Sequence, residues 1–228
     1  MRNIEVVFFD LDHTLWDYNT NAAITLKEVF YRFELKEGYD SENEFISAFH
    51  TYNYQLWDLY NYGKIDRTYI REQRFKKLLE DVSLDGKRGN EISDFFIEQC
   101  PRQEHLLPGS IELLDYLRQK YRLAVITNGF TDTQTIKIES SGISPFFEEV
   151  ITSENANARK PSKDIFDFAL KRMRIPAKNA VMIGDNISTD IEGANVSGLP
   201  SIWLTNSEDM APSNCKKVNT LSQVTTLL

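Results

Sequence analysis

The chain opens with a short apolar run that predicts a buried strand. Residues 4–9, "IEVVFF", are almost entirely apolar and rich in β-branched and aromatic side chains. A run this short, closed by polar residues, is typical of a strand covered on both faces. Two carboxylates, Asp10 and Asp12, follow at once. Like charges this close raise one another's pKa, so we expect a nearby cation or a chemical need for one charged and one neutral acid.

A long helical stretch follows. Residues 16–106 show helical periodicity and no strand pattern, with apolar stripes in segments 21–33, 41–62, 65–82 and 90–100. Ser41 with Glu44 three residues later has the pattern of a capping box, and Gly63 ends that helix. We therefore expect a helical insertion here.

Beyond residue 107, helices and strands alternate. Helical patterns at 111–120, 133–142, 163–173 and 188–198 each lead to a short apolar run, at 122–127, 147–152, 180–184 and 200–205. This alternation predicts an α/β fold with a parallel sheet covered by helices on both faces. The first strand has no partner nearby, so we expect it to join the same sheet. This gives a core domain of residues 1–15 and 107–228 and a helical cap domain of residues 16–106.

Composition narrows the function classes. The 228 residues carry a net charge of −8 and are 41% hydrophobic, so a large core can form but the basic surface of a nucleic-acid binder is missing. No apolar run approaches membrane-spanning length, and the two cysteines have no metal-ligand spacing. We expect a cytoplasmic protein, a monomer or weak homodimer, with neither a membrane nor a nucleic-acid polymer as partner.

Polar residues gather where the predicted strands end. Ligands of open parallel sheets bind beyond the carboxyl ends of the strands, and the helical insertion leaves from that edge, where it is placed to act as a lid. The residues expected there are Asp10, Asp12, Thr14, Thr127, Asn128, Lys160, Asp185 and Asp190.

Such a cluster suits a phosphate ester bound through Mg²⁺. The cation takes one or two protein carboxylates and completes its shell with water and phosphate oxygens. Lys160 and Thr127 suit the remaining phosphate oxygens. One aspartate can attack phosphorus, while a second, two residues along an extended chain, carries the proton of the leaving oxygen.

Four motifs, "DLDHT", "TNG", "RKP" and "GDNISTD", occur in the order found in the haloacid dehalogenase (HAD) superfamily, which the chain resembles over nearly its whole length. The resemblance implies a Rossmann-like core with an inserted helical-bundle cap. It implies that Asp10 is the nucleophile and Asp12 the general acid/base, with Thr127 and Lys160 completing the catalytic set. It also implies Mg²⁺ bound by Asp10, Asp12 and Asp185, with Asp190 behind these ligands. Phosphate binding is implied for Thr127, Asn128 and Lys160.

Dehalogenases of the superfamily lack an acid two residues after the nucleophile and need no metal, so Asp12 favours a phosphatase. The stretches "TNGF", "KPSKDIFDFAL" and "GDNISTDIEGAN" are similar to cytoplasmic pyrimidine 5′-nucleotidases. Arg159, before Lys160, departs from their pattern. The alternative to a 5′-nucleotidase is a sugar-phosphate phosphatase or phosphomutase. A metal-free dehalogenase and a non-catalytic binding protein are less favoured.

The expected cap contains an aromatic segment, "FHTYNYQLWDLYNYG". Phe49, Asn53, Leu56, Trp57 and Tyr60 recur at helical spacing, which is typical of a bundle seam. An aromatic face can also stack on a planar ring. We therefore take Asn53 and Trp57 as candidate substrate contacts.

Overall fold

The computed structural model describes residues 3–228 as two compact units. The α/β unit comprises the chain up to Tyr18 together with Glu104–Leu228, and the helical unit comprises Asn19–Gln103. The two connecting segments are bonded to each other inside the α/β unit: the Leu107 N–H donates to the Leu15 carbonyl at 2.8 Å, and Asp17 donates to His105 at 3.0 Å. This pairing keeps the chain as far as Tyr18 within the α/β unit.

The α/β unit is built on a six-stranded sheet in the order β3-β2-β1-β4-β5-β6, and every neighbouring pair is parallel. The first strand therefore lies inside the sheet, between β2 and β4, which confirms the expected α/β fold. A sixth strand near the C-terminus was not expected from the sequence. The bounds are β1 Val6–Phe9, β2 Arg122–Thr127, β3 Glu149–Thr152, β4 Ala180–Gly184, β5 Ser201–Leu204 and β6 Cys215–Val218.

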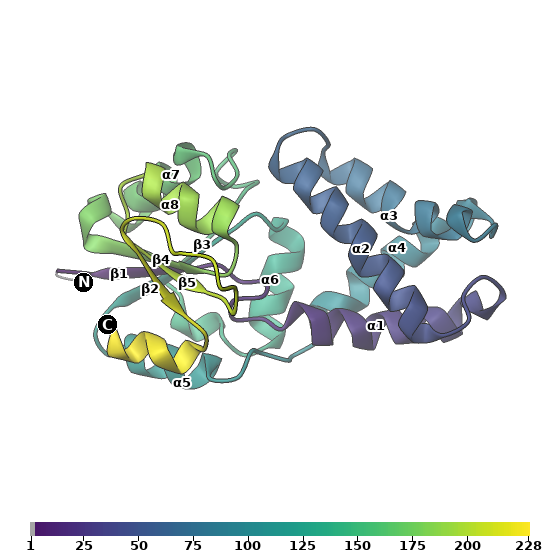
Figure 1. The fold of residues 1–228 in the computed structure, drawn as a ribbon, viewed down its shortest axis with the longest axis horizontal. Coiled ribbons are helices and arrows are strands. Elements are labelled where there is room, and N and C mark those ends of the chain that lie inside the picture. The colour runs from purple at the N-terminus through teal and green to yellow at the C-terminus, as the bar shows by residue number, and fades with distance from the viewer. Residues whose placement is uncertain (1–2) are drawn as a thin grey trace. The chain divides into compact units, whose positions relative to one another are not determined.

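Helices cover both faces of this sheet (Figure 1). Helices α7 (Lys163–Met173) and α8 (Glu192–Val196) lie on one face, and α5 (Ser110–Leu117) lies on the other beside the terminal 3₁₀ turn η7 (Leu221–Thr226). Alternate β1 residues face opposite layers, and Val6 and Phe8 join the core under α7. The remaining helix, α6 (Thr131–Ser140), follows β2. Covering both faces explains why all four residues of β1 are fully buried.

The helical unit contains α1 (Tyr18–Arg32) apart from its first residue, α2 (Glu42–Asn61), α3 (Arg67–Asp81) and α4 (Gly89–Gln99). Ser41 caps α2 by accepting from the Glu44 N–H at 3.2 Å, as expected, although the Glu44 carboxylate accepts from Asp40 instead of Ser41. The rings of Phe49, Phe75 and Phe96 lie 5.1–5.5 Å apart and join α2, α3 and α4. Within residues 3–228, no helix is both long and apolar enough to cross a membrane.

The parallel register decides which residues meet at the carboxyl edge. Phe9, the last residue of β1, is level with Val125 of β2 and Ile183 of β4. Asp10 continues the pairing, since its N–H donates to the Ile183 carbonyl at 2.9 Å. The segments that follow β1, β2 and β4 therefore leave the sheet side by side.

Candidate active site

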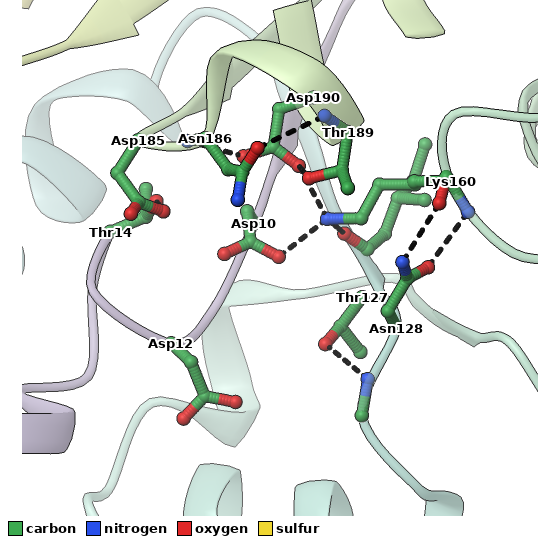
Figure 2. Close-up of polar contacts among 12 residues, drawn as sticks. Asp10, Asp12, Thr14, Thr127, Asn128, Lys160, Asp185, Asn186, Thr189 and Asp190 are labelled. Carbon is green, nitrogen blue, oxygen red and sulfur yellow. Dashed lines mark hydrogen bonds and ion pairs between the residues drawn. The ribbon is translucent and has the colours of Figure 1, made fainter. Parts of the chain in front are cut away.

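A buried lysine between two aspartates forms the centre of the site (Figure 2). The Lys160 ammonium lies 2.5 Å from Oδ1 of Asp10, 2.7 Å from Oδ1 of Asp190 and 2.8 Å from the Ile126 carbonyl. These three oxygens match its three N–H donors. Burial would lower the pKa of Lys160, but Asp10 and Asp190 raise it above its ordinary value. Lys160 is therefore a fixed positive charge at the end of β1.

Asn128 holds this lysine in place through two backbone contacts. Its side-chain Oδ1 accepts from the Lys160 N–H at 2.7 Å, and its Nδ2 donates to the Lys160 carbonyl at 2.9 Å (Figure 2). Ser153 Oγ in turn donates to the Asn128 carbonyl at 3.0 Å. The side chain of Asn128 thus joins the end of β2 to the loop before α7 and fixes where Lys160 enters the site.

Asp190 is held by the π-helical turn η6 (Ile187–Ile191) that follows β4. Its Oδ2 accepts from the Asn186 N–H at 3.1 Å, and its Oδ1 faces Lys160 and Thr189. A Cβ added to Gly184 would lie 2.2 Å from Asp190 Oδ2, so the glycine makes room for this carboxylate. Both oxygens of Asp190 are occupied, which suits a residue that orients Lys160 and its neighbours.

Asp185 completes an acidic cluster with Asp10 and Asp190. One oxygen of each of the three carboxylates lies within 4.8 Å of the others. Thr14 Oγ1 donates to Asp185 Oδ1 at 3.2 Å, and the Trp203 indole fixes the Asp185 carbonyl at 2.8 Å. Burial, followed by the charges of Asp10 and Asp190, raises the pKa of Asp185 well above its ordinary value. Burial likewise raises the pKa of Asp10 to about 7, against the lowering effect of Lys160.

The cluster fits a hard divalent cation. The cluster contains three carboxylates and a single ammonium group, so it carries excess negative charge. All the side-chain atoms that these carboxylates offer to a cation are oxygens, the ligands that hard divalent cations prefer. Lys160 contacts one oxygen of Asp10, and Thr14 contacts one oxygen of Asp185. The second oxygen of each is therefore the one placed to bind a cation such as Mg²⁺.

Asp12 has separate partners on α6. Lys137 Nζ lies 2.5 Å from its Oδ1, and Gln134 Nε2 donates to its Oδ2 at 2.8 Å. Figure 2 shows the Asp12 carboxylate directed away from the Asp10–Lys160 pair. Burial alone would raise the pKa of Asp12, but Lys137 and Gln134 lower it below its ordinary value. The like charges of Asp10 and Asp12 are thus each balanced by their own lysine.

Thr127 connects the two halves of the site from the end of β2. Its Oγ1 accepts from the Gly129 N–H at 3.0 Å and from Gln134 Nε2 at 3.3 Å. A hydroxyl that accepts through its lone pairs keeps its own hydrogen to donate. Thr127 can therefore donate to an anionic oxygen near Asp10 and Asp12.

The structure adds Gln134 and Lys137 to the residues expected from the sequence. Both are buried, and they lie one turn apart on the face of α6 that also buries Ile138. Two polar residues on the apolar stripe of a helix, just after a candidate phosphate-binding turn, were the available signal. Their contact with Asp12 spans more than 120 positions in sequence and required the sheet order to be known.

The two candidate substrate contacts on α2 differ in exposure. Asn53 is 3% exposed, and its Oδ1 accepts from Arg74 at 3.4 Å. The Arg74 guanidinium lies 4.7 Å from the Phe96 ring centroid, inside the helical unit. Trp57 is half-buried, with its ring 5.4 Å from that of Tyr60. Asn53 is therefore part of the bundle core, and Trp57 keeps an accessible surface.

The fold and the site define an enzyme of the parallel α/β class with an acidic centre at the carboxyl edge of its sheet. A family model for haloacid dehalogenase-like hydrolases matches residues 4–198. Pyrimidine 5′-nucleotidase YjjG of Escherichia coli is 30% identical over 200 residues, covering 87% of this chain and 84% of that protein. Glyceraldehyde 3-phosphate phosphatase of Methanothermobacter thermautotrophicus is 31% identical over 212 residues, covering 90% of this chain and 87% of that protein.

Among solved structures, the magnesium-bound HAD-hydrolase YfnB of Bacillus subtilis matches with a TM-score of 0.90 at 25% identity, covering 100% of this chain and 99% of that chain. The chain belongs to the haloacid dehalogenase-like hydrolase family, which confirms the resemblance carried by the four motifs. Within that family it is a phosphatase, a phosphoric monoester hydrolase.

Proposed function

We propose that this phosphatase is Mg²⁺-dependent, acts through an aspartyl-phosphate on Asp10, and hydrolyses pyrimidine nucleoside 5′-monophosphates. The observation that carries the mechanism is the contrast between the two neighbouring aspartates. Asp10 lies against Lys160 and the other carboxylates, where a phosphate and a cation would meet. Asp12 is held apart on α6, where it can serve the leaving group.

In the first half-reaction, a carboxylate oxygen of Asp10 forms a bond to phosphorus while the bond from phosphorus to the ester oxygen breaks. Despite burial, Lys137 and Gln134 hold the pKa of Asp12 below its ordinary value, so Asp12 must take up a proton before this step; it gives that proton to the departing oxygen and becomes a carboxylate again. Thr127 donates to a phosphoryl oxygen, and Lys160 compensates charge at Asp10. Asn128 contributes to phosphate binding by fixing the backbone of Lys160.

In the second half-reaction, a water oxygen forms the new bond to phosphorus, and the bond between phosphorus and Asp10 breaks. Asp12 takes the proton of that water, so both aspartates return to their initial state together with free phosphate. One residue thus acts first as an acid and then as a base, which requires its carboxylate to stay at the same place in both steps.

Mg²⁺ would be held by Asp10, Asp185 and the backbone carbonyl of Asp12, with Asp190 behind them. Bound there, the cation would neutralise phosphoryl charge and offset the excess of carboxylates. The chemistry of the donor set supports this assignment, as does the magnesium bound in the structurally similar YfnB.

The substrate proposal depends on the relatives and on the helical unit. YjjG and the PynA protein of Streptococcus pneumoniae are pyrimidine 5′-nucleotidases. Trp57 offers an aromatic surface suited to stacking on a base, an interaction worth about 1–3 kcal/mol per base. Asn53 is already engaged by Arg74, so the substrate contact is assigned to Trp57 first.

A second candidate is a phosphatase of small sugar phosphates. The glyceraldehyde 3-phosphate phosphatase is as similar to this chain as YjjG is, at 31% and 30% identity. Both candidates use the same chemistry at Asp10, so they differ only in which leaving group is recognised.

Phosphate release from a panel of nucleoside monophosphates and sugar phosphates, with Mg²⁺, tests the proposal. We expect the highest kcat/KM for pyrimidine 5′-monophosphates, and we expect Trp57→Ala to raise KM for nucleotides while sparing a small ester without a ring, such as glycerol 3-phosphate. Tyr54→Ala, a change of an exposed aromatic on the same helix, is the control. A tenfold preference for sugar phosphates, equal to about 1.4 kcal/mol in transition-state binding, would favour the second candidate.

A further inference from the structure

Lys137 is a buried cation outside the Asp10–Lys160 cluster. The residue is 6% exposed, its ammonium lies 2.5 Å from Asp12 Oδ1, and it sits 4.3 Å from the Trp16 ring centroid and 5.6 Å from that of Tyr18. A lysine ammonium is strongly hydrated, so a structure buries it only with compensating contacts. Here the compensation is one carboxylate and two aromatic faces, all within the α/β unit.

Gln134 provides a second contact from the same face of α6. Its Nε2 donates both to Asp12 Oδ2, at 2.8 Å, and to Thr127 Oγ1, at 3.3 Å. The side chain reaches them by crossing over Gly129: a Cβ at Gly129 would lie 1.5 Å from Gln134 Nε2. Gly129 does not have a positive φ, so the requirement for glycine comes from space and not from backbone conformation.

Together the two side chains fix the whole Asp12 carboxylate. A carboxylate held at one oxygen can still rotate about its last bond, whereas donors at both oxygens set the plane of the group. The two donors come from one rigid helix turn, and Thr127 links that turn to the end of β2. The arrangement resembles the way a second group orients a catalytic base in other hydrolytic sites.

We propose that Gln134 and Lys137 are positioning residues that hold the Asp12 carboxylate at the leaving-group side of the site through both half-reactions. This inference rests on the proposed function, because it assigns the two residues to the proton transfers of Asp12. Neither residue contacts phosphate in this role; each acts through Asp12.

Leaving-group chemistry separates this role from a structural one. A nucleoside is a poor leaving group and needs a proton from Asp12, whereas 2,4-dinitrophenolate leaves without one. The attack of water on the phospho-enzyme needs Asp12 for every substrate. Misplacing Asp12 should therefore slow both half-reactions with a nucleotide but only the second with 2,4-dinitrophenyl phosphate.

The experiment compares wild type, Lys137→Met, Lys137→Arg and Gln134→Leu in rapid-mixing assays with both substrates and Mg²⁺. Lys171→Met, a change of an exposed lysine on α7, is the matched control. For Lys137→Met we expect a burst of dinitrophenolate near one equivalent per enzyme, then turnover slowed by roughly 10- to 100-fold. With a nucleotide we expect a similar loss of kcat, no burst, and a smaller change in KM. Gln134→Leu should show the same pattern, and Lys137→Arg should regain part of the lost kcat.

Two results would overturn the inference. One is wild-type turnover in both Lys137→Met and Gln134→Leu. The other is a burst whose amplitude falls in step with the steady rate, since that marks fewer active molecules and hence a folding role. Failure of the proposed function looks different: the wild type itself would show no phosphate release that depends on Asp10.

Discussion

Asp10 and Asp12 stand two residues apart, and each is paired with a lysine, but the two pairs are built differently. The side chains of Lys160 and Asp10 are 2% and 11% exposed, and a second carboxylate, Asp190, shares the lysine. The side chains of Lys137 and Asp12 are 8% and 25% exposed, and aromatic rings take the place of the second carboxylate.

This difference matches the work proposed for each aspartate. A nucleophile must stay fixed at one distance from phosphorus, which a buried, multiply bonded pair provides. A proton carrier must exchange protons with a leaving group and with water, which needs a held but more accessible carboxylate. The site therefore separates two like charges by giving each a cation whose surroundings suit its role.

Asp10→Asn removes the nucleophile, and we expect it to reduce activity more than any other change at the two aspartate–lysine pairs. An amide cannot form the acyl-phosphate, so phosphate release should fall by about 10³-fold or more with every substrate. Asp12→Asn should instead retain phospho-enzyme formation with a good leaving group. Mass spectrometry of the quenched enzyme distinguishes the two. Turnover of Asp10→Asn near the wild-type rate would contradict covalent catalysis.

Lys160→Met and Lys137→Met should differ in stability. Without Lys160, Asp10 and Asp190 are left as uncompensated buried carboxylates, and breaking such a pair costs about 3–5 kcal/mol. Without Lys137, the more exposed Asp12 still has Gln134, so we expect a loss of roughly 1–2 kcal/mol. Urea unfolding measures both, with Lys171→Met as control. Equal losses would mean that the two pairs are energetically equivalent.

Mg²⁺ binding should depend on the carboxylates of Asp10 and Asp185 and not on the carboxylate of Asp12. Mg²⁺ at 100 times its dissociation constant should stabilise the folded protein by about 2.7 kcal/mol. Asp185→Asn should abolish the thermal shift, whereas Asp12→Asn should keep most of it because only the Asp12 backbone carbonyl is proposed as a ligand. A chelator should remove activity from the wild type. Full activity without divalent cations would refute the metal assignment.

Gly129→Ala tests the contact between Gln134 and Asp12, and it has the smallest expected effect of these changes. The added methyl group displaces Gln134, so kcat should fall by about tenfold, or about 1.4 kcal/mol. In a Gln134→Ala background the same change should cost almost nothing, because the clash is already gone. This non-additivity is measured by a double-mutant cycle. Additive losses would show that Gly129 serves another purpose.

Much of this architecture was predictable from local patterns. Strands β2 to β5 lie within two residues of the apolar runs, and α7 has the predicted bounds. The central position of β1 followed from the need to bury an apolar strand with no neighbour in sequence. Because Asp10, Asp185 and Thr127 end or follow strands, a parallel sheet brings them to one edge.

Other features depended on contacts that no local pattern encodes. β6 was missed because "CKKV" places two adjacent lysines between Cys215 and Val218 at the sheet edge, a weak strand signal. Lys137 could not be assigned because a lysine within a helix is ordinarily solvated. Its burial follows only from the placement of α6 against Asp12 and Trp16. The spacing of Asn53 fits both a bundle seam and a substrate contact, and its hydrogen bond with Arg74 comes from another helix.

The central place of β1 also has a consequence for synthesis. The strand is translated well before its neighbours β2 and β4, which span residues 122–127 and 180–184. The helical unit, residues 19–103, is complete before either neighbour has been translated. The nascent chain therefore carries the apolar stretch "VVFF" without its sheet partners at least until residue 122 is translated, a stage at which unpaired strands are prone to aggregate and chaperones act.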